Sequence, residues 1–300
     1  MYQFFIDNNQ IEGDTIRIAG ADYNHIRNVL RMRQGERFRV STDDGRSFYV
    51  RLAEYAQKEA IAEIEWEDLR DTELPIRVTL FQGIPKSDKM ETIIQKSVEL
   101  GVAEIIPVEM KHCVVKLDPK KVENRIRRWQ TIAESAAKQS KRGIIPQVHE
   151  PMNWKNAISL AKTLDITLVP YENEQGMQGT REAMGSIRPG QTVGIMIGPE
   201  GGFAPEEIAE IPEITREIRT NAAQKAENTV PETRSIEPEI KSAVMEAESS
   251  VTEARSAATE TEGAATDVGK IYRISLGSRI LRTETAGPAT LAMLIYALEN

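Results

Sequence analysis

Two short loop sequences contain the residue types that a small-ligand site requires. The first is Ile-Gly-Pro-Glu-Gly-Gly-Phe at residues 197–203, which ends the most apolar run of the chain. Glycines let a backbone approach a ligand closely and leave its amides exposed. No Gly-Lys-Ser/Thr follows, as a phosphate-binding P-loop would require, and the glycine spacing differs from the dinucleotide fingerprint. On its own the heptapeptide is explained equally well as an ordinary turn between a strand and a helix.

The second loop, residues 275–287, places two arginines and a glutamate directly before an apolar segment that is predicted to be helical. Thr283 or Thr285 would cap that helix, which accounts for the hydroxyl groups. Capping does not account for Arg279 and Arg282, because charged side chains beside an apolar run usually have a partner or a ligand. The second loop therefore favours a binding or catalytic role.

Two further segments carry positive charge that could meet phosphate groups. Residues 83–91 include Lys86 and Lys89, whereas Ser87 and Asp88 between them are better explained by helix capping. Residues 111–142 contain ten Lys and Arg against three Asp and Glu, a net charge of +7, whereas residues 220–269 contain four against ten, a net charge of −6. The overall charge of −8 therefore hides a basic region. Charge runs on helices are usually solvated faces, but local charge of this size favours a phosphate-binding face at least as strongly.

Several other chemistries lack support in the sequence. The three histidines have no metal-ligand spacing, the single cysteine permits neither a disulfide framework nor a thiolate zinc cluster, and the serine-hydrolase and zinc-protease motifs are absent. No apolar run is long enough to cross a bilayer, and the N-terminus has no basic cluster followed by an apolar stretch. We therefore expect a cytoplasmic protein that uses no metal and no membrane.

The elements that must position these loops divide the chain at about residue 72. Residues 1–72 are rich in β-forming residues and predict a small, mostly β domain. Residues 73–300 alternate strands with helices, which is typical of a parallel sheet covered by helices, with ligands at the carboxyl ends of its strands. The first domain is predicted to contain strands at residues 38–40, 47–52 and 61–66 and a helix at 23–32. The second is predicted to contain strands at 77–81, 103–108, 167–169 and 193–197 and helices at 89–100, 119–140 and 285–298.

Residues 220–269 interrupt this alternation. Between Ala204 and Ile271 the chain has no leucine and no aromatic residue, and Ala, Glu, Ser and Thr dominate. Such a segment cannot bury enough apolar surface to offset the entropy of ordering it. We expect a disordered acidic insertion within the second domain.

Taken together and in this order, the motifs resemble the RsmE family of ribosomal RNA small-subunit methyltransferases. The resemblance covers nearly the whole chain except the insertion. Any one motif is weak, but the ordered set is highly specific. The matching pieces are His25-Ile26 with Val29-Leu30-Arg31, Gly35-Glu36, residues 86–91 and 95–101, Arg128-Trp129 through Arg142, and residues 197–203 and 276–286.

The resemblance implies a PUA-like β-barrel followed by a SPOUT-type α/β domain with a C-terminal trefoil knot. It also implies a homodimer that binds S-adenosyl-L-methionine in the knot and methylates N3 of a uridine in 16S ribosomal RNA, free or in the assembled small subunit. One departure concerns RNA binding, because Gln3 stands where family members usually carry a basic residue.

The resemblance, combined with the loop positions, assigns the site residues. Arg282 is assigned to stabilise the uridine anion, and Glu200 and Glu284 are candidate bases between which the sequence does not choose; one of them could merely orient Arg282. The cofactor is assigned to Tyr171, Glu172, Gly198, Pro199, Gly201, Leu276, Gly277, Ile280, Leu281, Thr283, Thr285 and Ala286. RNA is assigned to Arg31, Arg33, Lys86, Lys89, Arg125, Arg128, Lys138 and Arg142.

Two alternative functions stay open at this point. A non-catalytic RNA-binding or ribosome-assembly factor would need a degraded cofactor loop, and the intact residues 276–286 speak against it. A SPOUT methyltransferase acting on ribose or on a transfer-RNA base would need different handling of the acceptor, which the sequence does not exclude.

Overall fold

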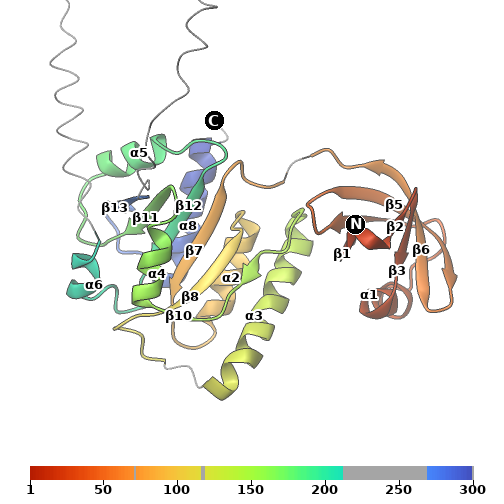
Figure 1. Ribbon diagram of the computed structural model, residues 1–300, viewed down its shortest axis with the longest axis horizontal. Helices are drawn as coiled ribbons and strands as arrows, with labels where there is room; N and C mark the ends of the chain where they lie inside the picture. Colours follow the sequence, from red (N-terminus) through yellow and green to blue (C-terminus); the bar gives the residue numbers. More distant parts are fainter. Residues whose placement is uncertain (71, 116–118, 212–268, 299–300) are drawn as a thin grey trace, which may run out of the picture. The chain divides into compact units, whose positions relative to one another are not determined.

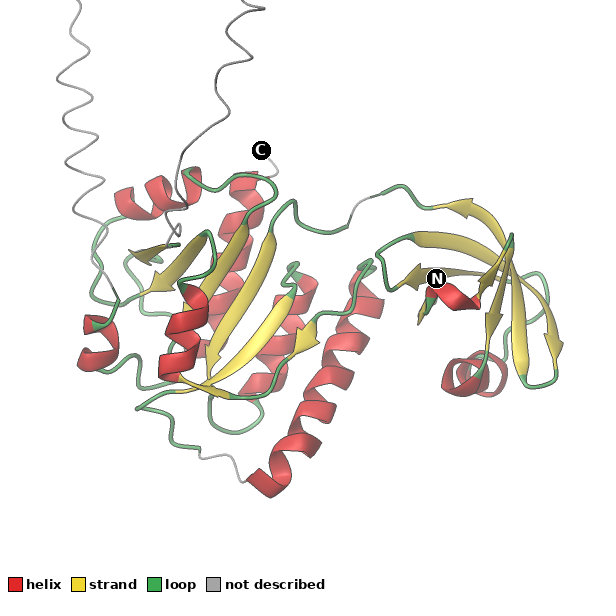
Figure 2. Cartoon of the chain, in the orientation of Figure 1, coloured by secondary structure: helices red, strands yellow, loops and turns green. Residues whose placement is uncertain are grey.

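The computed structural model describes residues 1–70, 72–115, 119–211 and 269–298 (Figures 1 and 2). The insertion expected at residues 220–269 lies outside the described residues apart from Gly269, and so does the disorder expected of it. The described residues form a mixed sheet near the N-terminus and a parallel sheet after it.

The N-terminal sheet has six strands in the order β1-β4-β5-β6-β3-β2. β1 pairs with β4 in parallel, and the other neighbours are antiparallel. The predicted strands are confirmed, whereas β1 to β3 were not predicted. The bounds are β1 (Gln3–Ile6), β2 (Ile11–Glu12), β3 (Thr15–Ile18), β4 (Arg37–Thr42), β5 (Ser47–Ala56) and β6 (Glu59–Glu67), with a short 3-10 helix η1 (Asn8–Gln10) between β1 and β2.

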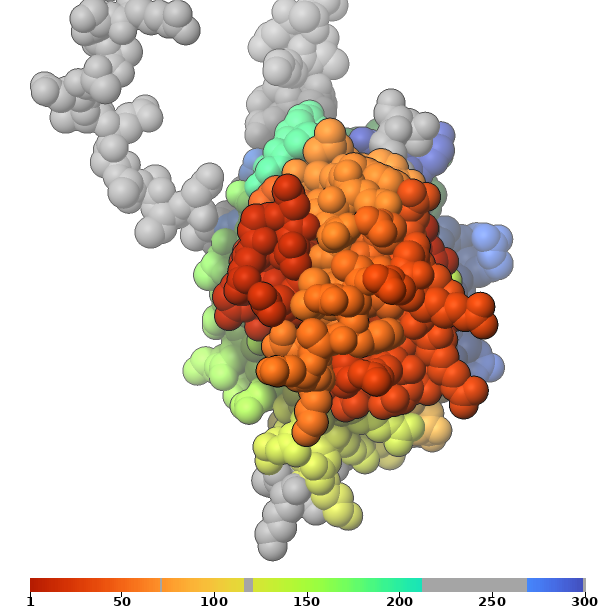
Figure 3. All heavy atoms as spheres, turned by 90° about the vertical axis from the view of Figure 1, so that its right-hand side faces the viewer, coloured from red at the N-terminus to blue at the C-terminus, as the bar shows by residue number. Residues whose placement is uncertain are grey.

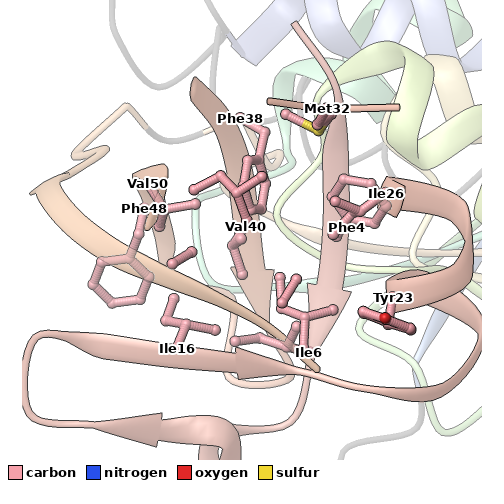
Figure 4. Close-up of a cluster of buried hydrophobic side chains, with 14 residues drawn as sticks. Phe4, Ile6, Ile16, Tyr23, Ile26, Met32, Phe38, Val40, Phe48 and Val50 are labelled. Atoms are coloured by element: carbon pink, nitrogen blue, oxygen red, sulfur yellow. The ribbon is translucent and has the colours of Figure 1, made fainter. Parts of the chain in front are cut away.

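Side-chain alternation on these strands makes the N-terminal core. Phe38 and Val40 of β4 and Phe48 and Val50 of β5 point to the same side, where they pack with β1, β3 and the helix that follows β3 (Figure 4). Residues between them on each strand must point to the opposite side, because side chains alternate along a strand. The sheet therefore has an apolar inner face and a polar outer face.

The helix predicted at residues 23–32 begins earlier and is irregular. An α-helix, α1 (Gly20–Asn24), continues into a single π-helical stretch, η2 (His25–Val29), and the helical stretch ends there. Arg31 has φ 53°, a left-handed conformation that does not continue a helix. A π-helical turn is common at functional sites but is not encoded by the 3.6-residue period, so the pattern of apolar residues could not predict it.

The second sheet is parallel throughout and follows the order β10-β8-β7-β12-β11-β13, with β9 paired to β8. Parallel neighbours require crossover connections, which explains the alternation of strands and helices in the sequence. The bounds are β7 (Arg77–Gly83), β8 (Glu104–Glu109), β9 (Gln147–Val148), β10 (Met152–Asn153), β11 (Ile166–Pro170), β12 (Thr192–Ile197) and β13 (Lys270–Ile274).

Helices cover both faces of this sheet (Figure 1). Phe81 of β7 packs with Trp154 and Ile158 of α4 on one face. Leu80, the preceding residue, points to the other face, where a Cβ added at Gly287 of α8 would lie 3.6 Å from it. α2 packs against both α3 and α8. The bounds are α2 (Lys89–Glu99), α3 (Pro119–Ser140), α4 (Trp154–Ala161), α5 (Gln178–Gly185), α6 (Pro205–Ala209) and α8 (Thr283–Leu298).

The α2 helix shows why the predicted helices form where they do. Its buried residues are spaced three and four apart, which places them on one face of a helix. The helix ends at Glu99, and Gly101, two residues further on, has a φ of 91°, which does not continue a helix and favours glycine. The buried residues are Met90, Ile93, Ile94, Ser97 and Val98.

A trefoil knot is a property of a continuous chain path, and residues 212–268 of that path lie outside the described residues. The knot therefore stays a prediction. Within the described ranges, no helix has the length and apolar character needed to span a membrane.

Candidate active site

Three loops meet where the neighbouring strands β11, β12 and β13 end. Because these strands are parallel, their carboxyl ends lie at one edge of the sheet, where ligands bind in open α/β sheets. The loops border a cavity of about 400 Å³. The cavity is lined by Lys89, Pro170, Tyr171, Glu172, Ile197, Gly198, Pro199, Glu200, Gly202, Phe203, Ser275, Leu276, Gly277, Ser278, Arg279, Ile280, Leu281, Arg282, Thr283 and Ala286.

Most of the predicted catalytic and cofactor residues lie in this lining, but three do not. Gly201 packs against His112 instead, and a Cβ there would lie 3.0 Å from the His112 Cβ. Thr285 is exposed on α8, and Glu284 lies beside the cavity without lining it. The sequence pattern missed Ser275, Ser278 and Phe203 as cavity residues, although their loops follow strand ends, which was a usable signal; Arg279 was singled out for its charge but was given no role.

Two close backbone approaches explain the glycines of the 197–203 loop. A Cβ at Gly198 would lie 3.0 Å from the backbone of Gly202, and Gly202 itself has φ 65°. A Cβ at Gly83, where β7 ends, would lie 2.6 Å from the Pro199 nitrogen. The loop is thus folded tightly on itself and against β7, which leaves its other side to the cavity.

A buried chain of hydrogen bonds fixes this loop to the C-terminal helix. The Gln82 side-chain amide donates to the Thr283 hydroxyl at 2.9 Å, and that hydroxyl donates to the Gly198 carbonyl at 2.7 Å. The Thr283 hydroxyl is therefore engaged as both acceptor and donor inside the protein. Thr283 lines the cavity, but its hydroxyl is best explained as holding the loop rather than gripping a ligand.

The two candidate bases share one ammonium group. Lys89 Nζ lies 3.2 Å from Glu200 Oε1 and 3.3 Å from Glu284 Oε2. The Glu200 carboxylate also accepts a hydrogen bond of 3.0 Å from the Lys86 backbone N–H. Lys89 thereby links the start of α2, the glycine-rich loop and the start of α8.

Burial alone would raise the pKa of Glu200. Backbone hydrogen bonds, among them the one from Lys86, and the contacts with Lys89 outweigh burial, so the pKa of Glu200 lies below its ordinary value of 4.5. The hydrogen bond with Glu200 in turn raises the pKa of Lys89. Glu200 is therefore a weak base that remains ionised at neutral pH.

Arg279 and Arg282 present free guanidinium groups to the cavity. Both residues are exposed, and neither side chain forms an ion pair or hydrogen bond with the part of the chain that the structure describes. A permanently charged group without an internal partner can stabilise an anion that develops on a bound substrate.

The residues assigned to RNA differ in how far their side chains are exposed to solvent. Lys89 and Lys138 are held in ion pairs, the latter 2.7 Å from Glu134, and both are partly buried. The others apart from Arg142 are exposed at the surface, with Arg128 2.7 Å from Glu91. The exposed residues are Arg31, Arg33, Lys86, Arg125 and Arg128.

Arg142 is a structural residue, which corrects its assignment to RNA. It is 2% exposed, and its guanidinium pairs with Glu73 and donates to the Val98 carbonyl at 3.2 Å. Its own carbonyl accepts a 2.7 Å hydrogen bond from Gln3. The side chain of Gln3 is likewise buried, so the residue at this position serves internal packing rather than a solvent-facing contact.

Comparison with known families defines the class of protein. The model of the RNA methyltransferase domain matches residues 72–220, and that of the RNA methyltransferase PUA domain matches residues 18–65. The fold is therefore that of an RNA methyltransferase with a PUA domain, and the predicted SPOUT-type and PUA-like folds are confirmed.

Individual relatives narrow this class. The chain is 36% identical over 221 residues to ribosomal RNA small subunit methyltransferase E of Bacillus subtilis (strain 168), covering 71% of this chain and 86% of that protein. The homologue of Mesomycoplasma hyopneumoniae (strain 232) is 31% identical over 210 residues, covering 70% of this chain and 86% of the homologue. This chain belongs to the ribosomal RNA small subunit methyltransferase E family.

Solved structures agree with the family assignment. The crystal structure of ribosomal RNA small subunit methyltransferase E from Neisseria gonorrhoeae bound to S-adenosyl methionine is 29% identical, with a TM-score of 0.66, covering 99% of this chain and 97% of that one. A putative methyltransferase from Legionella pneumophila in complex with the same cofactor is 25% identical, with a TM-score of 0.67 and coverage of 99% and 97%.

Proposed function

We propose that the protein transfers a methyl group from S-adenosyl-L-methionine to N3 of a uridine in 16S ribosomal RNA, free or in the assembled small subunit, in the cytoplasm. The observation that carries the proposal is the cavity where β11, β12 and β13 end, bordered by two glycine-containing loops and by two arginines that form no ion pair with the described residues. Relatives named ribosomal RNA small subunit methyltransferase E, one of them crystallised with S-adenosyl methionine, support the proposal.

The cavity residues fit such a cofactor. Its volume of about 400 Å³ is within the range of small-molecule sites. Gly277 has φ 100°, and among the described residues no atom beyond Gly277 and its two chain neighbours lies within 4 Å of where its Cβ would be, so the backbone there is open to a ligand. We assign the cofactor to the backbone of Gly198, Pro199, Leu276, Gly277, Leu281 and Ala286, with Tyr171, Glu172 and Ile280 as walls.

When bound, the cofactor supplies an electrophilic methyl group, so the protein must prepare the acceptor. Uracil N3 carries a proton and becomes nucleophilic only after losing it. We assign Arg282 to stabilise the resulting anion, because a nearby positive charge lowers the pKa of an acid. Removal of the proton to solvent then becomes easier near neutral pH.

The structure favours positioning roles for the two carboxylates over base catalysis. Glu200 has a lowered pKa and an ion pair with Lys89, so it takes up a proton poorly at neutral pH. Glu284 shares the same ammonium group and does not line the cavity. We infer that both hold Lys89 in place and thereby fix the start of α8, where Arg282 lies.

We further propose a homodimer formed through α8. Residues 285–298 of this helix include no charged side chain. A helix that is apolar all round is normally buried, yet Ala292 is exposed and Tyr296 is 74% exposed. Sedimentation should show a dimer, and Tyr296→Glu should shift it toward monomer because a buried, unpaired charge opposes association.

Mass spectrometry of ribosomal RNA tests the proposed reaction. RNA from cells with and without the gene is digested to nucleosides, and we expect N3-methyluridine in small-subunit RNA to be lost with the gene. Loss of a ribose-methylated nucleoside, or of a transfer-RNA modification instead, would reassign the acceptor. An unchanged modification profile would contradict the enzymatic proposal.

A further inference from the structure

Four planar side chains are stacked on the outer face of the N-terminal sheet. The rings of Tyr49 on β5 and Trp66 on β6 lie 5.0 Å apart at an angle of 29°. The Arg37 guanidinium lies 5.7 Å from the Trp66 ring centre, and the Arg70 guanidinium lies 5.9 Å from the Tyr49 ring centre. Arginine planes thus accompany both rings of the pair.

A β-bulge places Trp66 on this face. Val50 pairs with Ile64, and both contact the core, so regular pairing would set Trp66 opposite Phe48 and toward the core. The register shifts between Tyr49 and Val50, and Trp66 instead pairs with Tyr49. Bulges re-aim side chains and are found next to functional sites. The local fold therefore turns a tryptophan outward that the regular strand would bury.

The outward position leaves apolar surface in water. Trp66 is 47% exposed, and nearby Leu69 is 88% exposed. In the space-filling view, the orange residues that include β5 and β6 form much of the surface facing the viewer (Figure 3). Trp66, stacked on the half-buried Tyr49, is thus left without the burial that normally stabilises a domain, which indicates a binding role.

Charge on this face is balanced, so its chemistry differs from that of a phosphate site. Each arginine near the aromatic pair is matched by an acidic side chain. Attraction for the RNA backbone should therefore be small here, and stacking should dominate. The pairs are Arg37 with Glu65, Arg46 with Glu67, Arg51 with Glu63, and Arg70 with Asp68.

We propose that the aromatic–arginine stack (Arg37, Tyr49, Trp66 and Arg70), none of whose residues lines the methyl-transfer cavity, binds an unpaired nucleobase of the RNA substrate. Bases splayed out of RNA loops stack on exposed aromatic rings and on arginine planes. The Arg37 side chain is 55% exposed, so it can move aside or cover a base held against Trp66. This inference rests on the proposed function, since it takes the substrate to be RNA with unpaired segments.

Tryptophan fluorescence gives a direct readout. Trp129 and Trp154 are 5% and 9% exposed, so iodide in solution should quench chiefly Trp66. A short single-stranded fragment of small-subunit ribosomal RNA should protect the protein from iodide, whereas the same fragment annealed to its complement should protect it much less. Equal quenching with and without the single strand, at concentrations where it is bound, would overturn the proposal.

Substitution gives the second test. Trp66→Ala should weaken binding of the single strand by roughly 5- to 150-fold, the usual worth of one stacked base, while Trp66→Phe should retain most of it. The slope of affinity against salt should stay unchanged, because no phosphate contact is lost. Leu69→Ala, which removes a neighbouring exposed apolar side chain, is the matched control and should bind normally.

The outcomes separate this inference from the proposed function. If wild type methylates RNA but Trp66→Ala binds and reacts as wild type does, the stack is structural and the inference fails alone. If wild type methylates no RNA but single strands still protect Trp66 from iodide, the proposed reaction is wrong and the proposed base-binding role of the stack is retained. Cofactor affinity and the thermal melting curve of Trp66→Ala should match wild type, which excludes unfolding as the cause.

Discussion

Arg282 provides the sharpest test at the scale of single residues. It lines the cavity, is exposed and has no ion pair among the described residues, so its removal should leave the fold intact. We expect Arg282→Ala to lower kcat by about 100- to 1000-fold, as loss of one group that stabilises a transition-state anion does, with cofactor affinity nearly unchanged. Steady-state kinetics and calorimetry with the cofactor measure both quantities. Arg279→Ala removes the other cavity guanidinium and shows which of the two arginines the reaction depends on; near-normal turnover of the Arg282 variant would reject the assignment.

The lowered pKa of Glu200 predicts that the stability of the folded protein depends on pH. Its pKa is lower in the folded protein than its ordinary value of 4.5. A lowered carboxyl pKa stabilises the fold above the unfolded-state pKa, and that contribution is lost as the pH falls through the folded-state pKa. Glu200→Gln should therefore melt at a lower temperature than wild type at neutral pH, and the difference should shrink in acid. Calorimetric melting curves from neutral pH to below 4.5 measure this difference; a constant difference would mean that the charge of Glu200 contributes nothing.

At the scale of secondary-structure elements, we predict that the basic helix α3 contributes to RNA affinity. Arg125, Arg127 and Arg128 are exposed, but Arg127 pairs with Glu123 and Arg128 with Glu91. Arg125 forms no ion pair within the described ranges and should meet phosphate most readily. Replacing all three by Gln should weaken RNA binding and flatten its salt dependence by roughly one unit per lost phosphate contact. An unchanged slope in filter-binding titrations would make α3 a solvated surface.

The elements also show what a single sequence can and cannot predict. α3 begins and ends at the predicted residues because its amphipathic period runs for 22 residues. α4 and α5, with eight residues each, are too short for the period to stand out. Trp66 faces outward because of a β-bulge. Strict alternation of side chains along the strand would place it on the core side, so the sequence pattern predicts its side wrongly.

The part of the site that lies in loops directly after strands could be predicted from the sequence. The two cavity loops identified from the sequence, which follow β12 and β13, come directly after apolar strands, and parallel strands bring their carboxyl ends together. The bridge from Lys89 to Glu200 and Glu284 joins three distant segments, so no local pattern contains it. The burial of Arg142 likewise depends on Glu73, which lies 69 positions away.

At the scale of the whole molecule, the segment between α6 and β13 should be replaceable. The residues on either side of it are bonded to each other directly, since the Arg273 guanidinium donates to the carbonyls of Ile208 at 2.6 Å and Ile211 at 2.9 Å. Replacing residues 221–267 by a short Gly/Ser linker should preserve folding and cofactor binding, because halving a loop changes its closure entropy by only about 0.6 kcal/mol. Melting curves and calorimetry check this, and an unfolded product would show that the segment stabilises the protein.

The hydrogen bond between Gln82 and Thr283 has a consequence for the synthesis of the protein. The two residues are 201 positions apart in the chain. At a translation rate of about 5–20 residues per second, Gln82 leaves the ribosome roughly 10–40 s before its partner is made. The glycine-rich loop cannot form its hydrogen bond with Thr283 until that residue has been synthesised. A nascent chain therefore has no finished cofactor site, and premature termination anywhere before α8 yields a protein that cannot methylate the ribosomes being made around it.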